Sequence, residues 1–139
     1  AGATVLNLGE QNIQLGFPLR AEAFFQKVTD EFRGTPTGDL ATQKLSALKS
    51  SPAFRESRKA WKVLEKTAKA AESGKTSAEL YLLFQEAESK CQLPEIIQSS
   101  AAMQKALRNA GNASLLEAWA GLMPNAQLAT ALEAMVEAD

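Results

Sequence analysis

The sequence predicts an all-α protein: about seven helices forming three helix-turn-helix repeats, a short α-solenoid, with an extended N-terminal arm. Apolar residues recur at three- and four-residue steps almost everywhere after residue 18, whereas alternating strand patterns are hard to find. Prolines and glycines divide the chain into segments of helical length. Gly38, Gly74 and Gly111 lie 36 and 37 residues apart, and such a period is typical of stacked helical hairpins.

The chain is predicted to have two parts, residues 1–17 and 18–139. Residues 1–17 place their apolar side chains in no clear helical stripe, which predicts an extended arm that packs against another surface. Residues 18–139 are predicted to form a single helical-repeat domain, since a chain of 139 residues is long enough for one domain with a sizeable core.

The first three predicted helices follow proline and glycine positions. Pro18 suits a first helical turn, and residues 19–33 form a helix that ends at Gly34. Gly38 and Asp39 open a second helix, which Ser51 and Pro52 end as they start a third. The residues predicted to face inward are Phe24, Phe25, Val28 and Phe32, then Leu40, Ala41, Leu45 and Leu48, then Phe54, Trp61, Leu64, Ala68 and Ala71.

Four further helices are predicted to follow: Ser77 to about Cys91, Pro94 to Gly111, Ser114 to Met123, and a last one from Pro124. Their predicted apolar positions are Leu80, Leu83, Phe84 and Ala87, then Ile97, Met103, Ala106 and Leu107, then Leu115, Leu116, Trp119 and Leu122, then Leu128, Leu132, Met135 and Val136. Trp61 and Trp119 both lie in apolar stripes, which favours core positions over interface anchors.

Gly74-Lys75-Thr76 matches the last three residues of a phosphate-binding loop motif. Such a loop requires an earlier glycine, but Lys69 stands there, and the preceding segment is helical where a buried strand is needed. We therefore interpret Gly74 as a left-handed residue that ends a helix, with Thr76 or Ser77 capping the next one.

The repeats resemble the pentatricopeptide repeat over roughly residues 20–139. In that family the second helix reads Ala-Leu-x-Leu-Phe-x-x-Met, and a Lys-Gly-x-x-Pro-Asp tail follows. The matching features here are Leu83-Phe84, Lys90, Pro94 and Glu95, then Leu107, Ala110, Gly111 and Met123. Departures are Cys91 for the tail glycine, Leu80 or Leu116 for a small alanine, and Trp61 for a tyrosine; tetratricopeptide or other hairpin repeats stay open.

The resemblance implies single-stranded RNA as a possible ligand, with one base read by two polar side chains per repeat. With Gly38, Gly74 and Gly111 as turn glycines, the base-reading pairs are Thr29 with Lys59, Glu65 with Glu95, and Ala102 with Leu132. The second pair would place two carboxylates beside a polyanion, and the third offers no hydrogen bond. RNA is therefore the less favoured ligand.

Charge is distributed unevenly along a chain of net charge −1. Residues 44–75 carry nine basic and three acidic residues, whereas residues 76–139 carry three and eight. In the basic segment, Arg58, Lys62, Lys66 and Lys69 follow four- and three-residue steps and share one helix face. This stripe is either an ordinary solvated face or a contact for an acidic partner surface or, less favoured, RNA.

Residues for catalysis are missing. The chain has no histidine, and its single cysteine, Cys91, can form neither an internal disulfide nor a zinc site. We expect no enzyme activity, no cofactor and no metal. Asn112-Ala113-Ser114 fits a glycosylation acceptor, but nothing else predicts secretion. No apolar run is long enough to span a bilayer, so we expect a soluble protein.

The function expected from these observations is that of a non-catalytic structural or adaptor subunit that binds a protein partner through its helical-repeat surface, with possible partner-binding residues Arg58, Lys62, Lys66 and Lys69. In size and architecture the chain is similar to accessory subunits on the catalytic head of mitochondrial ATP synthase in some protists. That similarity implies the alpha subunit of the head as partner and the mitochondrial matrix as location, the cytoplasm being the alternative. Two other functions stay open: an organellar RNA-binding repeat protein, and a secreted effector or helical ligand carrier, which would require the helices to close into a bundle around a pocket.

Overall fold

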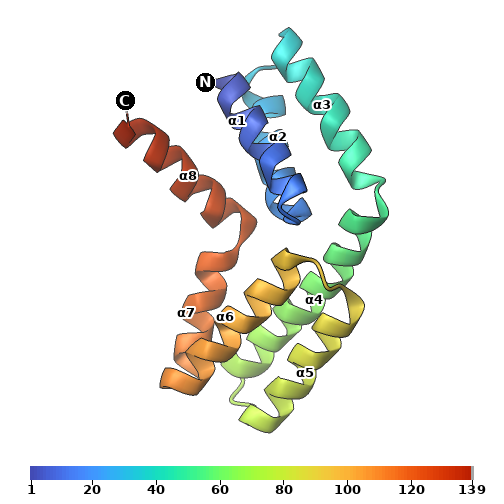
Figure 1. The fold of residues 1–139 in the computed structure, drawn as a ribbon. Coiled ribbons are helices and arrows are strands. Elements are labelled where there is room, and N and C mark those ends of the chain that lie inside the picture. The colour runs from blue at the N-terminus through green and yellow to red at the C-terminus, as the bar shows by residue number, and fades with distance from the viewer. Residues whose placement is uncertain (139) are drawn as a thin grey trace. The chain divides into compact units, whose positions relative to one another are not determined.

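A computed structural model describes residues 1–138, which form eight helices and contain no strand (Figure 1). The helices are α1 (Gly2–Gln14), α2 (Pro18–Glu31), α3 (Pro36–Lys49), α4 (Pro52–Glu72), α5 (Ser77–Lys90), α6 (Pro94–Ala110), α7 (Asn112–Leu122) and α8 (Pro124–Ala138). The all-α prediction is confirmed, with one helix more than the sequence suggested. Proline begins five of these helices, at the position where its missing N–H removes no hydrogen bond.

The described residues form two compact units. The first unit comprises residues 1–55 and 124–138, so it holds α1, α2, α3, the first turn of α4, and α8. The second unit comprises residues 56–123, which are the rest of α4 with α5, α6 and α7. Residues from 18 onward, predicted to form a single repeat domain, are divided between these two units. The single domain stays a prediction.

The extended arm predicted for residues 1–17 is wrong, because residues 2–14 form α1. Val5 and Leu6 on this helix are each 6% exposed. Gly9 lies against α2 so closely that a Cβ atom there would come within 2.5 Å of Phe25 Cε1. Gly9 therefore allows close packing of α1 on α2, and this contact outweighs the low helix propensity of glycine.

The turn between α2 and α3 also differs from the prediction. Gly34, with a φ of 77°, is the left-handed turn residue, whereas Gly38 lies in the first turn of α3. A Cβ atom on Gly38 would come within 1.9 Å of the carbonyl oxygen of Phe32, so only glycine fits there. Thr35 caps α3, since its Oγ1 accepts a hydrogen bond from the Gly38 N–H at 3.1 Å. Leu40, predicted to face inward, is 43% exposed.

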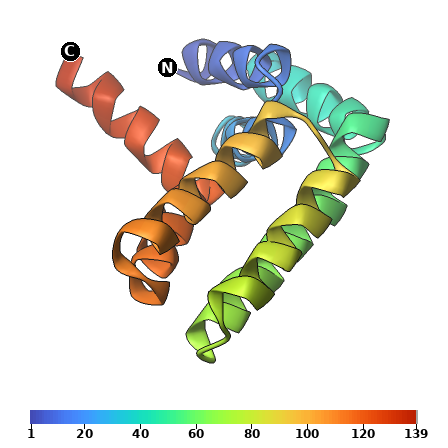
Figure 2. The same ribbon diagram turned by 60° about the horizontal axis from the view of Figure 1, so that its bottom comes forward.

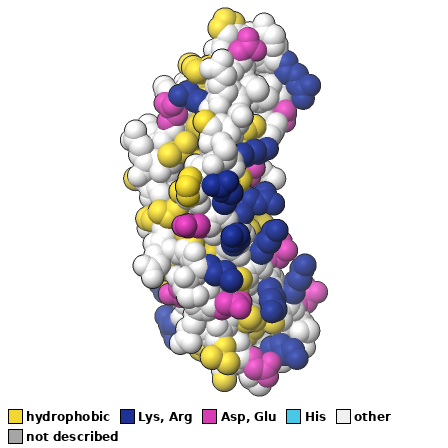
Figure 3. Space-filling model, turned by 90° about the vertical axis from the view of Figure 1, so that its right-hand side faces the viewer, with side chains coloured by type: hydrophobic (Ala, Val, Ile, Leu, Met, Phe, Trp, Pro, Cys, Tyr) yellow, Lys and Arg dark blue, Asp and Glu magenta, His cyan; other side chains and the backbone are white. Residues whose placement is uncertain are grey.

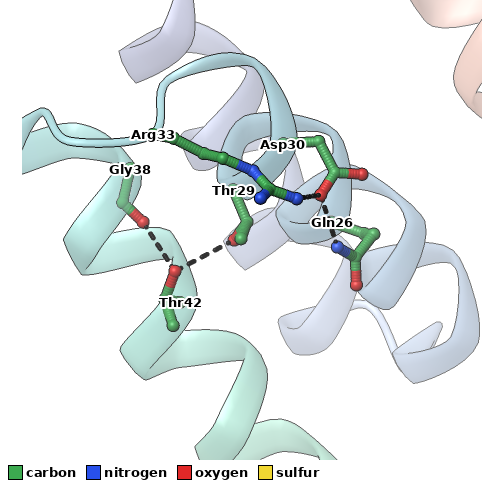
Figure 4. Close-up of polar contacts among 6 residues, drawn as sticks. All are labelled: Gln26, Thr29, Asp30, Arg33, Gly38 and Thr42. Atoms are coloured by element: carbon green, nitrogen blue, oxygen red, sulfur yellow. Dashed lines mark hydrogen bonds and ion pairs between the residues drawn. The ribbon is translucent and has the colours of Figure 1, made fainter.

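Polar side chains on α2 and α3 make short-range contacts beside this turn (Figure 4). Thr42 Oγ1 lies 3.0 Å from the carbonyl oxygen of Gly38 and 3.4 Å from Thr29 Oγ1. On α2, Asp30 Oδ1 accepts hydrogen bonds from Gln26 Nε2 at 2.9 Å and from Arg33 Nη2 at 3.4 Å. These contacts join polar groups that all belong to the α2–α3 hairpin and its turn.

The second unit consists of two helical hairpins, α4 with α5 and α6 with α7, as Figures 1 and 2 both show. Its core comprises Ala60, Val63, Leu64, Ala68, Ala71, Leu80, Phe84, Ala87, Cys91, Ile96, Met103, Leu107, Leu115 and Trp119. Trp61 packs against this core with its ring centroid 4.8 Å from that of Trp119. The prediction that both tryptophans belong to apolar packing is confirmed.

The Gly74-Lys75-Thr76 turn joins α4 to α5. Gly74 has a φ of 83°, a left-handed conformation in which a side chain would be strained, and Thr76 Oγ1 accepts from the Glu79 N–H at 3.3 Å. The interpretation as a helix end followed by a cap is confirmed. Asn112 links this turn to α7, because its Nδ2 donates to the carbonyl oxygens of Ala71 at 3.1 Å and Lys75 at 3.2 Å.

Of the helices in the described chain, none combines the length and apolar character that a membrane crossing requires.

Candidate functional site

The four residues of the predicted basic stripe, Arg58, Lys62, Lys66 and Lys69, are all exposed on α4. The opposite face of α4 carries buried Ala60, Leu64, Ala68 and Ala71, so the core fixes which face the stripe presents to solvent. Figure 3 shows the side of the molecule on which α4 and α5 lie. Lys and Arg side chains gather over these two helices, with some Asp and Glu side chains among them. The prediction that the stripe shares one helix face is confirmed.

The stripe is only partly neutralised by neighbouring acidic residues. Lys69 Nζ lies 3.6 Å from Glu65 Oε1, in a pair whose side chains are 77% and 49% exposed. A pair this exposed contributes little to stability, about 0.2–1 kcal/mol at most. Within the described chain, Lys62 and Lys66 form no ion pair, so their charges can meet a partner.

The base-reading positions implied by the family resemblance are poorly placed for RNA. Glu95 is only 3% exposed, so its side chain cannot meet a base edge without leaving the interior. The observed turn glycine, Gly34, shifts the first pair from Thr29 and Lys59 to Phe25 and Arg55. Phe25 is fully buried, so this pair lacks one of its two base-reading side chains.

Groups with reactive chemistry are engaged in packing. Cys91 is buried, and its Sγ lies 3.5 Å from Ser57 Oγ. Nowhere in residues 1–138 do three or more His, Cys, Asp or Glu side chains gather as metal ligands would. Asn112, the residue of the glycosylation motif, uses its side-chain nitrogen in the two hydrogen bonds to Ala71 and Lys75.

The first unit contains an apolar pocket of about 220 Å³ between α1, α2 and α8. Its apolar lining consists of Val5, Val28, Phe32, Leu132, Met135 and Val136. The ion pair of Lys27 with Glu31 lies beside it. This pocket is smaller than typical ligand pockets of about 300–1,000 Å³.

The second unit contains a groove of about 410 Å³ between the end of α4 and α5 that sequence reasoning missed. We call it the α4–α5 groove; it is lined by Lys66, Ala70, Lys75, Glu79, Leu82, Leu83 and Glu86. Leu82 is 67% exposed, so its apolar surface is accessible in the groove. The spacing of Glu79, Leu82, Leu83 and Glu86 on one helix face was the available signal, but the predicted apolar positions of this helix include Leu83 and not Leu82.

Compared with known proteins, the chain matches no protein-family model, no curated protein and no solved structure.

Proposed function

We propose that this chain is a non-catalytic structural or adaptor subunit that binds a protein partner through the basic stripe of α4. The observation that supports this proposal most strongly is the arrangement of the stripe itself. Four basic residues lie on the solvent face of one helix, whose other face is held by the core. Cations fixed in this way give an acidic partner surface a defined orientation and a faster encounter.

The partner that the architectural similarity implies is the alpha subunit of a mitochondrial ATP synthase head. In this proposal the chain works in the mitochondrial matrix and its role on the enzyme complex is structural. Helical-hairpin arrays suit such a role, because they offer an extended surface without chemistry of their own.

A pull-down from the native source at moderate salt tests the proposal with a matched pair of variants. Lys62→Glu with Lys66→Glu reverses two charges of the stripe. Lys105→Glu with Arg108→Glu reverses two exposed charges on α6 in the same unit and serves as the control. We expect the stripe variant to lose a stoichiometric protein partner that the wild type and the control retain, as identified by mass spectrometry.

Two results would refute the proposal. One is a protein complex that survives reversal of the stripe; the other is equal loss in both variants, which would indicate nonspecific charge attraction. Sequencing of RNA in the same eluates tests the alternative of an organellar RNA-binding protein, which the basic composition of residues 44–75 favours. RNA enriched by the wild type and lost with the stripe variant would establish that alternative instead.

A further inference from the structure

We infer that the α4–α5 groove is the docking site for an amphipathic helix of a protein partner, with acidic residues along the edge that faces α4 and basic residues along the edge that faces α5. This inference rests on the proposed function and specifies the kind of partner. The groove and the basic stripe are continuous, because Lys66 belongs to both.

The walls of the groove carry opposite charges around an apolar floor. Lys66 stands on the α4 wall and Lys75 at the turn, while Glu79 and Glu86 stand on α5. None of these four side chains forms an ion pair with another described residue. Their charges are therefore available to a partner that presents the complementary pattern.

The floor of the groove suits apolar side chains from a helix. Ala70 is small and lets a partner approach α4 closely, and Leu82 and Leu83 supply apolar surface on α5. Glu79, Leu82, Leu83 and Glu86 recur at three- and four-residue steps, so they form one line along α5. A helix laid along this line packs its own apolar ridge between α4 and α5.

Other occupants fit the groove less well. Five of its seven lining residues are exposed, whereas a site for a small molecule buries about 70–90% of its ligand. An extended peptide that adds a strand needs a sheet edge, and residues 1–138 contain no strand.

The test uses a designed helical peptide labelled with fluorescein, with a leucine stripe, a glutamate edge and a lysine edge. We expect saturable binding to the full chain by fluorescence anisotropy. Leu82→Ala removes an exposed side chain, so it should leave the denaturation midpoint unchanged and weaken binding. The matched control is Leu15→Ala, which removes a leucine that is 63% exposed in the first unit and should leave binding unchanged.

Charge reversal then tests the polarity of the walls. Lys66→Glu with Lys75→Glu makes both walls acidic and should weaken binding about tenfold. Adding Glu79→Lys and Glu86→Lys reverses both walls, and binding should return, because a helix turned end for end exchanges its two edges. A general charge effect would not produce this return.

Three results would overturn the inference: no saturation up to about 1 mM peptide, equal effects of Leu82→Ala and Leu15→Ala, or no return of binding in the fourfold variant. Self-association of the chain that Leu82→Ala abolishes in sedimentation would assign the groove to a second copy and also overturn it. In the native pull-down, a partner that depends on the stripe but survives Leu82→Ala would refute this inference alone and leave the proposed function standing.

Discussion

Asn112 is predicted to fasten the α6–α7 hairpin to the α4–α5 turn. Its side-chain nitrogen donates to the carbonyl oxygens of Ala71 at 3.1 Å and Lys75 at 3.2 Å. Asn112→Ala deletes both donors. A hydrogen bond contributes about 0.5–1.5 kcal/mol net, and the contact with Lys75 is exposed, so we expect a loss of about 1–2 kcal/mol in the free energy of unfolding.

Urea denaturation followed by tryptophan fluorescence measures this loss in the relevant unit, because Trp61 and Trp119 both lie in the second unit. With an m-value of about 2 kcal/mol per M, the midpoint should fall by roughly 0.5–1 M without a change in slope.

Asn109→Ala is the matched control, since Asn109 is exposed on α6 and its side chain forms no hydrogen bond with the described residues. The control should shift the free energy of unfolding by less than about 0.5 kcal/mol. If the two variants had the same midpoint, the hydrogen bonds of Asn112 would contribute nothing to the free energy of unfolding, and our account of the second unit would be wrong.

The remaining stability predictions concern three glycines, Gly9, Gly121 and Gly74. Gly9→Ala should destabilise the first unit by about 1–3 kcal/mol, because the new Cβ would lie 2.5 Å from Phe25 Cε1. In contrast, Gly121→Ala on α7 should be neutral or stabilising, because a Cβ built there meets no neighbouring group within 4 Å. Circular dichroism during urea denaturation checks both, and a neutral Gly9→Ala would contradict the packing of α1 on α2. Gly74→Ala should cost about 1–2 kcal/mol through its left-handed φ of 83° alone; a variant as stable as the wild type by the fluorescence assay would contradict that reason.

Much of the candidate site could be predicted from the sequence, because it depends on helix periodicity. The spacing of Arg58, Lys62, Lys66 and Lys69 fixes a common face once α4 is helical, and the apolar residues between them fix which face is buried. The α4–α5 groove could not be predicted in the same way. The groove forms only when the turn at Gly74 brings Lys66 and Ala70 beside Leu82 and Leu83. The periodicity of each helix does not predict how the two helices pair.

The sequence by itself determined the helices from α2 to α8, most of their ends and the exposed basic face, since proline positions, caps and apolar spacing act over a few residues. Only the tertiary structure decided the roles of several glycines. Gly9 lies inside α1 because contact with Phe25 favours a residue without a side chain, and Gly38 lies inside α3 because Phe32 O occupies the space of its Cβ. Helix propensity counts against glycine in both places, but packing between helices outweighs it, and such packing depends on residues that are distant in the sequence.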